Sequence, residues 1–434
     1  SAEGTSADQP EADASGDAEA EAFTMANPEL YPFDLRPQGH DIISFWLFHT
    51  IVKCYEHTGE VPFDAVMING HVLDENREKM SKSKGNVVLP REVMAEYPID
   101  AIRFWAASAS VGDDFPFSDK DITAGEKLLR KLWNASKLVD QLAPGQPDEP
   151  DELAAIDRWL LAELDDAVAD ITAHFEAYEF AKARDRLRTF FWNTFCDDYL
   201  EIAKQREREA RSASEDASGE RSEPRAGEES MEYALRTAHR TFLLLWAPIL
   251  PHVTEELWQA TYAEGTGTAS QFDSVHTERW PTERGYDADL AAGETAMAVI
   301  SALRRYKSER QLPLNADLAS VTVHGDVAGF EDAIRDVMHV GELEVRDDEP
   351  EIATEIASIG LEYATLGPQY GAKVGEIDDA IDAGEFELDE DAGVLRVAGE
   401  ELDEELFEVA FERTYSGDGE MLETDDAVVI VREE

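Results

Sequence analysis

Cysteine and long apolar runs are scarce in this sequence of 434 residues. The only two cysteines, Cys54 and Cys196, lie far apart and lack the paired spacing of metal ligands, so we predict neither a zinc site nor a disulfide framework. No apolar run reaches about 18 residues, the shortest plausible membrane span, and no signal peptide opens the chain. We therefore expect a reduced, cytoplasmic protein without a membrane segment.

Positive charge is also in short supply. The chain has 38 Lys and Arg against 95 Asp and Glu, a formal net charge of −57, but its hydrophobic fraction of 43% is high enough for folded domains. Acidic groups at this density repel one another unless salt screens them, so we expect a cytoplasm with very high salt. An acidic protein that binds basic partners is the alternative.

The sign of the charge inverts in one stretch, Lys79-Met80-Ser81-Lys82-Ser83-Lys84-Gly85-Asn86. Ammonium groups and hydroxyls suit a polyphosphate, and Gly85 allows a sharp turn, so we predict a loop that closes on a transient phosphate group. A strand is expected before it, at 65–68, and a helix after it, from Pro90, which is the order of a nucleotide site in an α/β sheet. A solvated basic loop is the alternative. The spaced glycines of a P-loop are absent.

Residues 79–83 read Lys-Met-Ser-Lys-Ser, which resembles the second signature of class I aminoacyl-tRNA synthetases. The flanking stretches GHVLD, KGNVV and YPIDAIRFWAAS resemble the valyl-tRNA synthetase family in particular, within a run from about Leu30 to Leu142. The resemblance implies a valine–tRNA ligase, with valine, ATP carrying Mg²⁺, and tRNA(Val) as its partners. The alternatives are the isoleucyl or leucyl family and a non-catalytic tRNA-binding remnant.

The same resemblance assigns roles in the reaction to the loop. Lys82 would stabilise the charge that builds on the triphosphate as the carboxylate attacks the α-phosphate, and Lys79 would be the supporting cation. The resemblance also implies that Asp41 and His71 contact ATP. Asp41 could instead cap a helix, and His71 could instead have a structural role. The full set of implied ATP contacts is Gly39, Asp41, His71, Val72, Met80, Ser81 and Ser83.

Two apolar residues are candidates for the amino-acid pocket. Ile42 and Trp46 are four residues apart in a helix expected from about Asp41 to His57, so they share one face. Spacing alone favours core packing, whereas the resemblance implies that they form a wall for the side chain of valine. For two further tryptophans, Trp105 and Trp133, we predict core positions.

The chain divides into four predicted parts. Residues 1–27 are acidic and lack apolar periodicity, so we expect disorder. Residues 28–142 would form the second half of an α/β, Rossmann-like class I catalytic fold, and 152–262 an all-α anticodon-binding helical bundle. Residues 287–434 are expected to form a small α+β appendage.

Basic residues also gather outside the loop. Arg184, Arg186 and Arg188 alternate along one predicted helix and could meet tRNA phosphates, with Arg184 and Arg188 as the candidates; balancing nearby acids is the alternative. A second concentration, from Arg304 to Arg310, lies in a helix expected from Asp287.

Two family features have no counterpart in this sequence. The first class I signature, His-x-Gly-His or close to it, does not occur, and the editing insertion that removes mischarged threonine in the valyl family is not recognisable. We therefore expect a fragment that begins inside a longer, monomeric enzyme. On its own it should not form valyl-adenylate at a useful rate.

Overall fold

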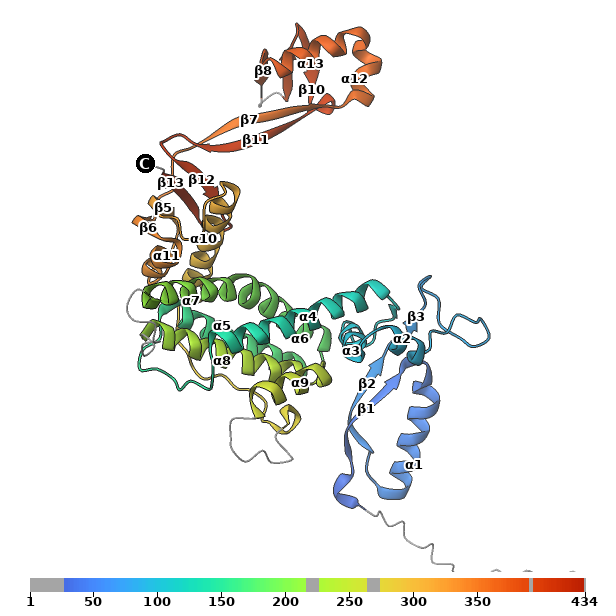
Figure 1. Cartoon of the computed structure of the whole chain (residues 1–434). Coiled ribbons are helices and arrows are strands. Elements are labelled where there is room, and N and C mark those ends of the chain that lie inside the picture. Colours follow the sequence, from blue (N-terminus) through green and yellow to red (C-terminus); the bar gives the residue numbers. More distant parts are fainter. Residues whose placement is uncertain (1–26, 216–225, 264–273, 390–392, 433–434) are drawn as a thin grey trace, which may run out of the picture.

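The computed structural model describes residues 27–215, 226–263, 274–389 and 393–432, so all of the predicted disordered segment except Asn27 lies outside the described residues. An α/β unit adjoins a helical bundle, and a sheet domain with a long two-stranded ribbon extends from the other end of that bundle (Figure 1). Of the helices in the described ranges, none combines the length and apolar composition that a membrane crossing requires.

Two parallel strands form the centre of the α/β unit. In this pair Gly39 lies opposite Asn69, so both strands end at the same edge. The elements of this part are η1 (Pro28–Leu30), β1 (Phe33–Gly39), η2 (His40–Ile42), the π-helical η3 (Ile43–Leu47), α1 (Phe48–Thr58) and β2 (Phe63–Asn69). The predicted strand and helix are confirmed, although the helix begins irregularly.

The second part of the α/β unit surrounds the lysine-rich loop. The predicted helix after the loop is confirmed as α2, with Pro90 in its first turn. Trp105 is 8% exposed and packs with Val93 and Ile122 in a small core, as predicted. The elements are β3 (Val72–Leu73), α2 (Pro90–Glu96), α3 (Ile99–Ala106) and β4 (Phe115–Pro116), with β3 and β4 paired in parallel.

The helical bundle has a continuous apolar core that includes the fully buried rings of Phe191, Phe242 and Trp246. Trp133 is 36% exposed, so its predicted core position is wrong: it lies on the outer face of its helix. The bundle comprises α4 (Asp119–Leu142), α5 (Ala155–Glu176), α6 (Phe180–Thr189), the π-helical η4 (Phe190–Tyr199), α7 (Leu200–Glu215), α8 (Ala226–Trp246), α9 (Pro251–Thr261) and η6 (Val275–Thr277).

Helix α3 attaches the α/β unit to the bundle by hydrogen bonds to backbone groups. Asp100, 3% exposed, accepts hydrogen bonds from the backbone N–H groups of His252 (3.1 Å) and Val253 (2.7 Å), in the first turn of α9. Arg103 donates to the carbonyl oxygens of Pro248 (2.8 Å) and Ile249 (3.0 Å). Helix α3 is thus fixed to the turn between α8 and α9 and to the first turn of α9.

The sheet domain shares the apolar core of the bundle. Its four strands have the order β12-β13-β5-β6. One residue of the predicted basic concentration, Lys307, is fully buried and donates to the carbonyl oxygens of Leu314, Ala316 and Met338, so its role is structural. The elements are α10 (Leu290–Glu309), β5 (Leu318–His324), α11 (Glu331–Met338), β6 (Val340–Arg346), β12 (Glu420–Glu423) and β13 (Val428–Arg432).

A distal module with its own apolar core lies at the far end of the ribbon formed by β7 (Ile352–Leu361) and β11 (Phe407–Tyr415) (Figure 1). The predicted single appendage therefore has two separate cores, because the ribbon carries the module away from the sheet domain. The module contains α12 (Tyr363–Tyr370), η7 (Gly371–Lys373), α13 (Val374–Asp382), β8 (Phe386–Asp389), β9 (Val394–Val397), β10 (Glu400–Asp403) and η8 (Glu404–Leu406).

Candidate active site

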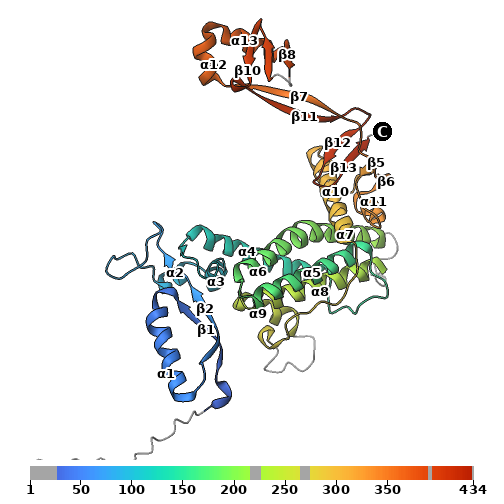
Figure 2. The same ribbon diagram turned by 180° about the vertical axis from the view of Figure 1, so that it is seen from behind.

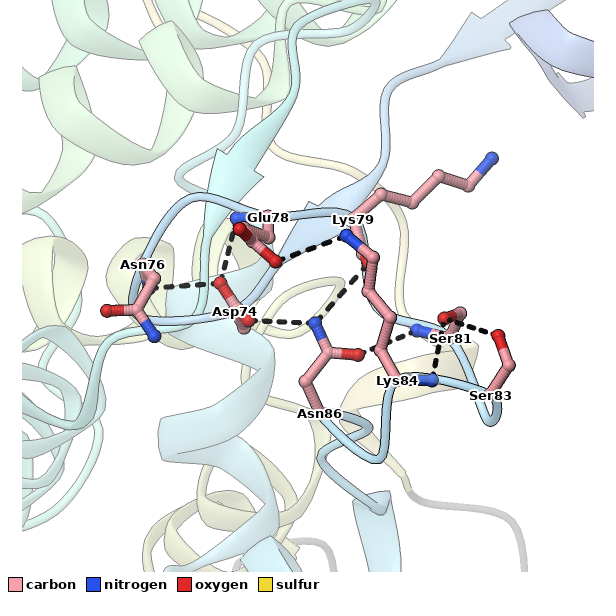
Figure 3. A network of polar contacts seen from close by, with 8 residues as sticks. All are labelled: Asp74, Asn76, Glu78, Lys79, Ser81, Ser83, Lys84 and Asn86. Carbon is pink, nitrogen blue, oxygen red and sulfur yellow. Dashed lines mark hydrogen bonds and ion pairs between the residues drawn. The ribbon is translucent and has the colours of Figure 1, made fainter.

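The lysine-rich loop is closed at its base by a carboxylate and an amide. Asp74 accepts hydrogen bonds from the backbone N–H groups of Asn76 (3.0 Å) and Glu78 (2.8 Å) and from the side-chain amide of Asn86 (2.8 Å). The Asn86 bond, followed by the backbone bonds, lowers the pKa of Asp74. Figure 3 shows the bond between Asp74 and Asn86, which joins the two ends of the loop.

Serine and asparagine groups shape the tip of the loop. The backbone N–H of Ser81 donates to the side-chain oxygen of Asn86 (2.9 Å), and the hydroxyls of Ser81 and Ser83 lie 3.2 Å apart. The N–H of Gly85 donates to the carbonyl oxygen of Ser81 (3.1 Å), and Gly85 has a φ of 73°, a conformation that favours glycine. Lys84 forms an ion pair with Glu78 at 3.1 Å. The turn predicted at Gly85 is confirmed.

The side chain of Lys79 points away from this network, toward the edge where the parallel strands end (Figure 3). Its Nζ lies 3.2 Å from Oδ2 of Asp41 and 3.1 Å from Nε2 of His71. Because an ammonium group only donates, Nε2 of His71 accepts and the ring proton is on Nδ1. The Lys79 hydrogen bond lowers the pKa of Asp41. The cap of η2 is Gly39, so Asp41 does not have the alternative role of a helix cap.

Close backbone packing positions His71 at this edge. Its N–H donates to Oδ1 of Asp114 (2.6 Å), and its ring lies 4.4 Å from that of His40, edge to face. A Cβ atom on Gly70 would lie only 1.9 Å from the carbonyl oxygen of Asp113, so this position requires glycine. Segments distant in sequence, from the ends of β1 and β2 and from the loop, therefore meet at the carboxyl edge of parallel strands, where α/β sheets bind ligands.

The remaining predicted contacts differ in their surroundings. Lys82 is exposed and forms no hydrogen bond or ion pair within the part of the chain that is described. Val72 is 38% exposed, Ser83 is exposed, and Met80 is half-buried. Lys82 is thus the cation of the loop that no acidic group of the described chain neutralises.

The two residues predicted for the amino-acid pocket lie on the surface. Ile42 is 38% exposed and Trp46 is 55% exposed, at the start of the irregular helix that follows β1. The described residues therefore do not enclose a pocket around them. Their role as a wall for the substrate stays a prediction.

The two arginines predicted to contact tRNA have different environments. The guanidinium of Arg184 lies 4.7 Å from the ring centre of Phe104, pairs with Asp185, and belongs to a side chain that is only 14% exposed. Arg188 is exposed, with its guanidinium 5.8 Å from the ring centre of Trp192. Only Arg188 presents its charge to a large ligand.

Several residues of this site were missed by the sequence interpretation. Asp74 and Asn86 hold the loop, and Asp114 positions His71, but all three act across gaps in sequence that local patterns do not reveal. The signal that was available is the pair of turn-forming residues, Asp74 and Asn86, which flank the lysines at either end.

Comparison with known proteins places this site within a class. Residues 14–118 match the family of class I tRNA synthetases (I, L, M and V), and residues 157–323 match the anticodon-binding domain of tRNA ligases. The chain thus contains a class I tRNA synthetase catalytic segment followed by an anticodon-binding domain.

Within that class the similarity is to valine–tRNA ligases. The chain is 62% identical to the valine–tRNA ligase of Haloarcula marismortui, over 96% of this chain and 44% of that protein. It is 38% identical to the valine–tRNA ligase of Methanothermobacter thermautotrophicus, over 79% of this chain and 37% of that protein. It is 34% identical to the valine–tRNA ligase of Archaeoglobus fulgidus, over 92% of this chain and 46% of that protein. The resemblance to the valyl family is confirmed, and the Haloarcula relative agrees with the predicted high-salt setting. The chain spans less than half the length of these relatives.

Proposed function

We propose that this chain supplies the second-signature half of the active site and the tRNA-binding bundle of an ATP-dependent valine–tRNA ligase. The enzyme would activate valine as valyl-adenylate and transfer it to tRNA(Val). The observation that carries the proposal is the contact of Lys79 with Asp41 and His71, which joins the signature loop to the carboxyl edge of the strands. We further propose that the enzyme is a cytoplasmic monomer in which tRNA contacts Arg188.

The proposed first step is an in-line displacement at phosphorus. A carboxylate oxygen of valine forms a bond to the α-phosphorus of ATP, and the bond to the bridging oxygen of pyrophosphate breaks. Lys82, exposed and without an acidic partner among the described residues, would meet the negative charge that builds on the leaving pyrophosphate. Lys79, held by Asp41, would fix the triphosphate against Gly39 and His71.

Mg²⁺ would enter with the triphosphate. The described residues contain no group of three or more His, Cys, Asp or Glu side chains arranged to hold a metal ion, whereas the loop is rich in groups that suit phosphate oxygens. Mg²⁺ keeps several waters and binds substrate phosphates with one or two carboxylates, so it fits a site of this kind. When bound, it would neutralise charge on the phosphate oxygens. We propose no zinc.

The exposure of Ile42 and Trp46 supports the proposal that the described chain provides one side of the site. A pocket for a branched aliphatic side chain needs apolar walls on several sides, and these two residues supply only one. The relatives are more than twice as long as the matched portion, so the other walls would come from the remainder of the enzyme. We therefore propose that this chain alone does not form valyl-adenylate.

Valine-driven ATP–pyrophosphate exchange in concentrated KCl tests this function. We expect no exchange with this chain alone, and exchange when it is extended upstream to include the first signature. Exchange by the chain alone would contradict the half-site proposal. Faster exchange with isoleucine or leucine would favour those families, and no exchange in either form would favour a non-catalytic tRNA-binding remnant.

A further inference from the structure

The signature loop begins with a tight turn that leads into Lys79. The backbone N–H of Asp74 donates to the carbonyl oxygen of Glu78 (2.9 Å), and the N–H of Glu78 donates in return to Oδ1 of Asp74 (2.8 Å). Directly after this turn, Lys79 pairs with Leu73 as an isolated antiparallel bridge. We call residues 73–79 the first turn. Lys79 is therefore attached to the end of β3.

A second turn follows and carries Lys82. The N–H groups of Lys84 (3.2 Å) and Gly85 (3.1 Å) both donate to the carbonyl oxygen of Ser81, so the chain reverses its direction here. Lys82 lies within this reversal and is exposed. We call residues 81–86 the second turn. The two lysines that we propose for the triphosphate therefore belong to different turns, and their separation depends on how the turns are joined.

The side chain of Asn86 joins the two turns (Figure 3). Its Nδ2 donates to Oδ2 of Asp74 (2.8 Å) and to the carbonyl oxygen of Lys79 (3.4 Å), both in the first turn. Its Oδ1 accepts a hydrogen bond from the N–H of Ser81 (2.9 Å), in the second turn. One side chain thus bonds to the backbone on both sides of Met80, the residue between the turns.

Other contacts hold the second turn only weakly. The ion pair of Lys84 with Glu78 also links the turns, but these side chains are 55% and 59% exposed, so solvent screens it. Within the described part of the chain, no hydrogen bond or ion pair joins residues 81–86 to a group outside the loop. Figure 2 shows the loop projecting from the α/β unit on the side away from the helical bundle. The half-buried bond between Asn86 and the Asp74 carboxylate is therefore the main link between the turns.

We propose that Asp74 and Asn86 are positioning residues for the reaction, because their hydrogen bond sets the place of Lys82 relative to Lys79. The inference rests on the proposed function, in which both lysines act on the triphosphate. Lys79 is held at the strand edge by Asp41, so a second turn bonded to the first confines the backbone from which Lys82 projects. A misplacement of about 1 Å in such a group can cost about a hundredfold in rate.

The test exchanges the two groups of this bond. Asn86→Asp places a second carboxylate where Nδ2 now lies 2.8 Å from Asp74, which replaces a donor by a like charge but keeps an acceptor for Ser81. Asp74→Asn/Asn86→Asp restores one donor and one acceptor and has the net charge of the wild type. The matched control, Asn76→Asp, adds the same charge to the same loop. The Asn76 side chain is exposed and forms no hydrogen bond within the described residues.

Valine-driven ATP–pyrophosphate exchange by the upstream-extended chain, measured over a range of ATP concentrations, gives the effect on the reaction. Asn86→Asp should lower kcat about a hundredfold and change the KM for ATP less than about threefold, because Lys82 acts on charge that develops in the transition state. The double variant should recover most of the lost kcat, and the Asn76→Asp control should stay within about threefold of the wild type. A double variant as slow as Asn86→Asp would overturn the proposal, as would a raised KM with kcat unchanged.

Trypsin cleavage of the 434-residue chain tests the link between the turns without any assay of activity. Asn86→Asp should speed cleavage at the lysines of the second turn about tenfold, as the loss of a charge-assisted hydrogen bond predicts, and the double variant should return to the wild-type rate. Cleavage of Asn86→Asp at the wild-type rate would show that the bond does not hold the turns together. An unchanged thermal midpoint checks that each variant folds.

Failure of the inference and failure of the proposed function give different results. If the wild-type extended chain catalyses exchange and Asn86→Asp does so equally well, the positioning role is wrong and the proposed function stands. If the wild-type extended chain catalyses no exchange, the proposed function fails and the positioning role fails with it.

Discussion

The α/β unit and the helical bundle differ in how they bury apolar side chains. Among the described residues, sixteen of the twenty-two large apolar side chains that are exposed lie between Leu30 and Val111. The segment from α4 to α9 contributes two, Trp133 in α4 and Tyr178 in the turn between α5 and α6. The bundle thus closes its own core, whereas the α/β unit leaves an extensive apolar surface open.

The helical bundle therefore contributes more to the stability of the fold, whereas the α/β unit is the part that we propose takes part in the reaction. In the bundle the carboxylate of Asp157 is buried and accepts hydrogen bonds from Tyr199, Arg206 and Ser230. Polar groups of the signature loop, such as Lys82, are exposed. A concentration of exposed apolar side chains is typical of interaction sites, which agrees with the proposal that other walls of the site come from the remainder of the enzyme.

The largest effect on stability is expected from Asp157→Ala. This carboxylate is fully buried, with its oxygens 2.6 Å from the Tyr199 hydroxyl and 2.6 Å and 3.1 Å from the two terminal nitrogens of Arg206. Its removal leaves the guanidinium of Arg206, whose side chain is only 19% exposed, without its counter-charge and the hydroxyls of Tyr199 and Ser230 without their acceptor, which should cost about 3 kcal/mol of unfolding free energy. Denaturant unfolding at constant KCl, followed by circular dichroism, measures this loss.

A matched control for this prediction lies on the same helix. Asp166 is 54% exposed and pairs with Arg186 at 3.1 Å, so Asp166→Ala should cost less than about 1 kcal/mol. If the two variants lose the same unfolding free energy, the buried hydrogen bonds of Asp157 contribute no more to stability than an exposed ion pair does.

For Lys82→Ala in the α/β unit we expect a loss of activity without a loss of stability. If Lys82 stabilises charge only in the transition state, its loss should reduce valine-driven ATP–pyrophosphate exchange by the upstream-extended chain about 10²–10³-fold. Because the side chain is exposed, the thermal midpoint should not change. Lys84→Ala is the control, since Lys84 pairs with Glu78, and its effect should be less than about tenfold. Similar losses in both would mean that overall loop charge, and not Lys82, matters.

The α/β unit and the helical bundle also show which structural features local sequence patterns can predict. The sequence predicted an all-α bundle, and the structure shows how one of its long helices starts: Ser118 caps α4 by accepting a hydrogen bond from the N–H of Asp121. Local propensity and capping act over a few residues, so they are visible in sequence. The predicted domain boundaries and site roles stay predictions.

What the sequence patterns did not reveal depends on contacts between distant segments. The contact between Asp41 and Lys79 spans 38 residues, and the bond that holds the loop spans 12, so neither follows from spacing. The exposure of Trp133 was missed because a tryptophan on an amphipathic helix is more often buried. The distal module was missed because strand patterns alone do not show that β7 and β11 leave the sheet domain as a ribbon.

The junction between the two regions provides a smaller test. Asp100→Ala removes the carboxylate that accepts the N–H groups of His252 and Val253, and should cost about 1–2 kcal/mol, as the loss of a helix cap does. Hydrogen exchange at the start of α9 should increase, while the interior of α5 should stay protected. Asp100→Asn keeps an acceptor and should have a weaker effect. Unchanged exchange at 252–253 in the Ala variant would show that Asp100 does not hold the junction.

The smallest effect is expected for the pH dependence of Asp198, in the π-helical segment of the bundle. Burial raises the pKa of this carboxyl to about 6, with Arg304 lowering it and Asp197 raising it. The unfolded value is about 3.9, so the folded state binds the proton more tightly, and its contribution to stability is lost as pH rises from about 4 to about 6. After a reduction for solvent screening we expect a loss of about 1 kcal/mol. Asp198→Asn should flatten the unfolding free energy across this window and make the protein more stable above it; a variant that retains the same slope would assign the pH dependence to another group.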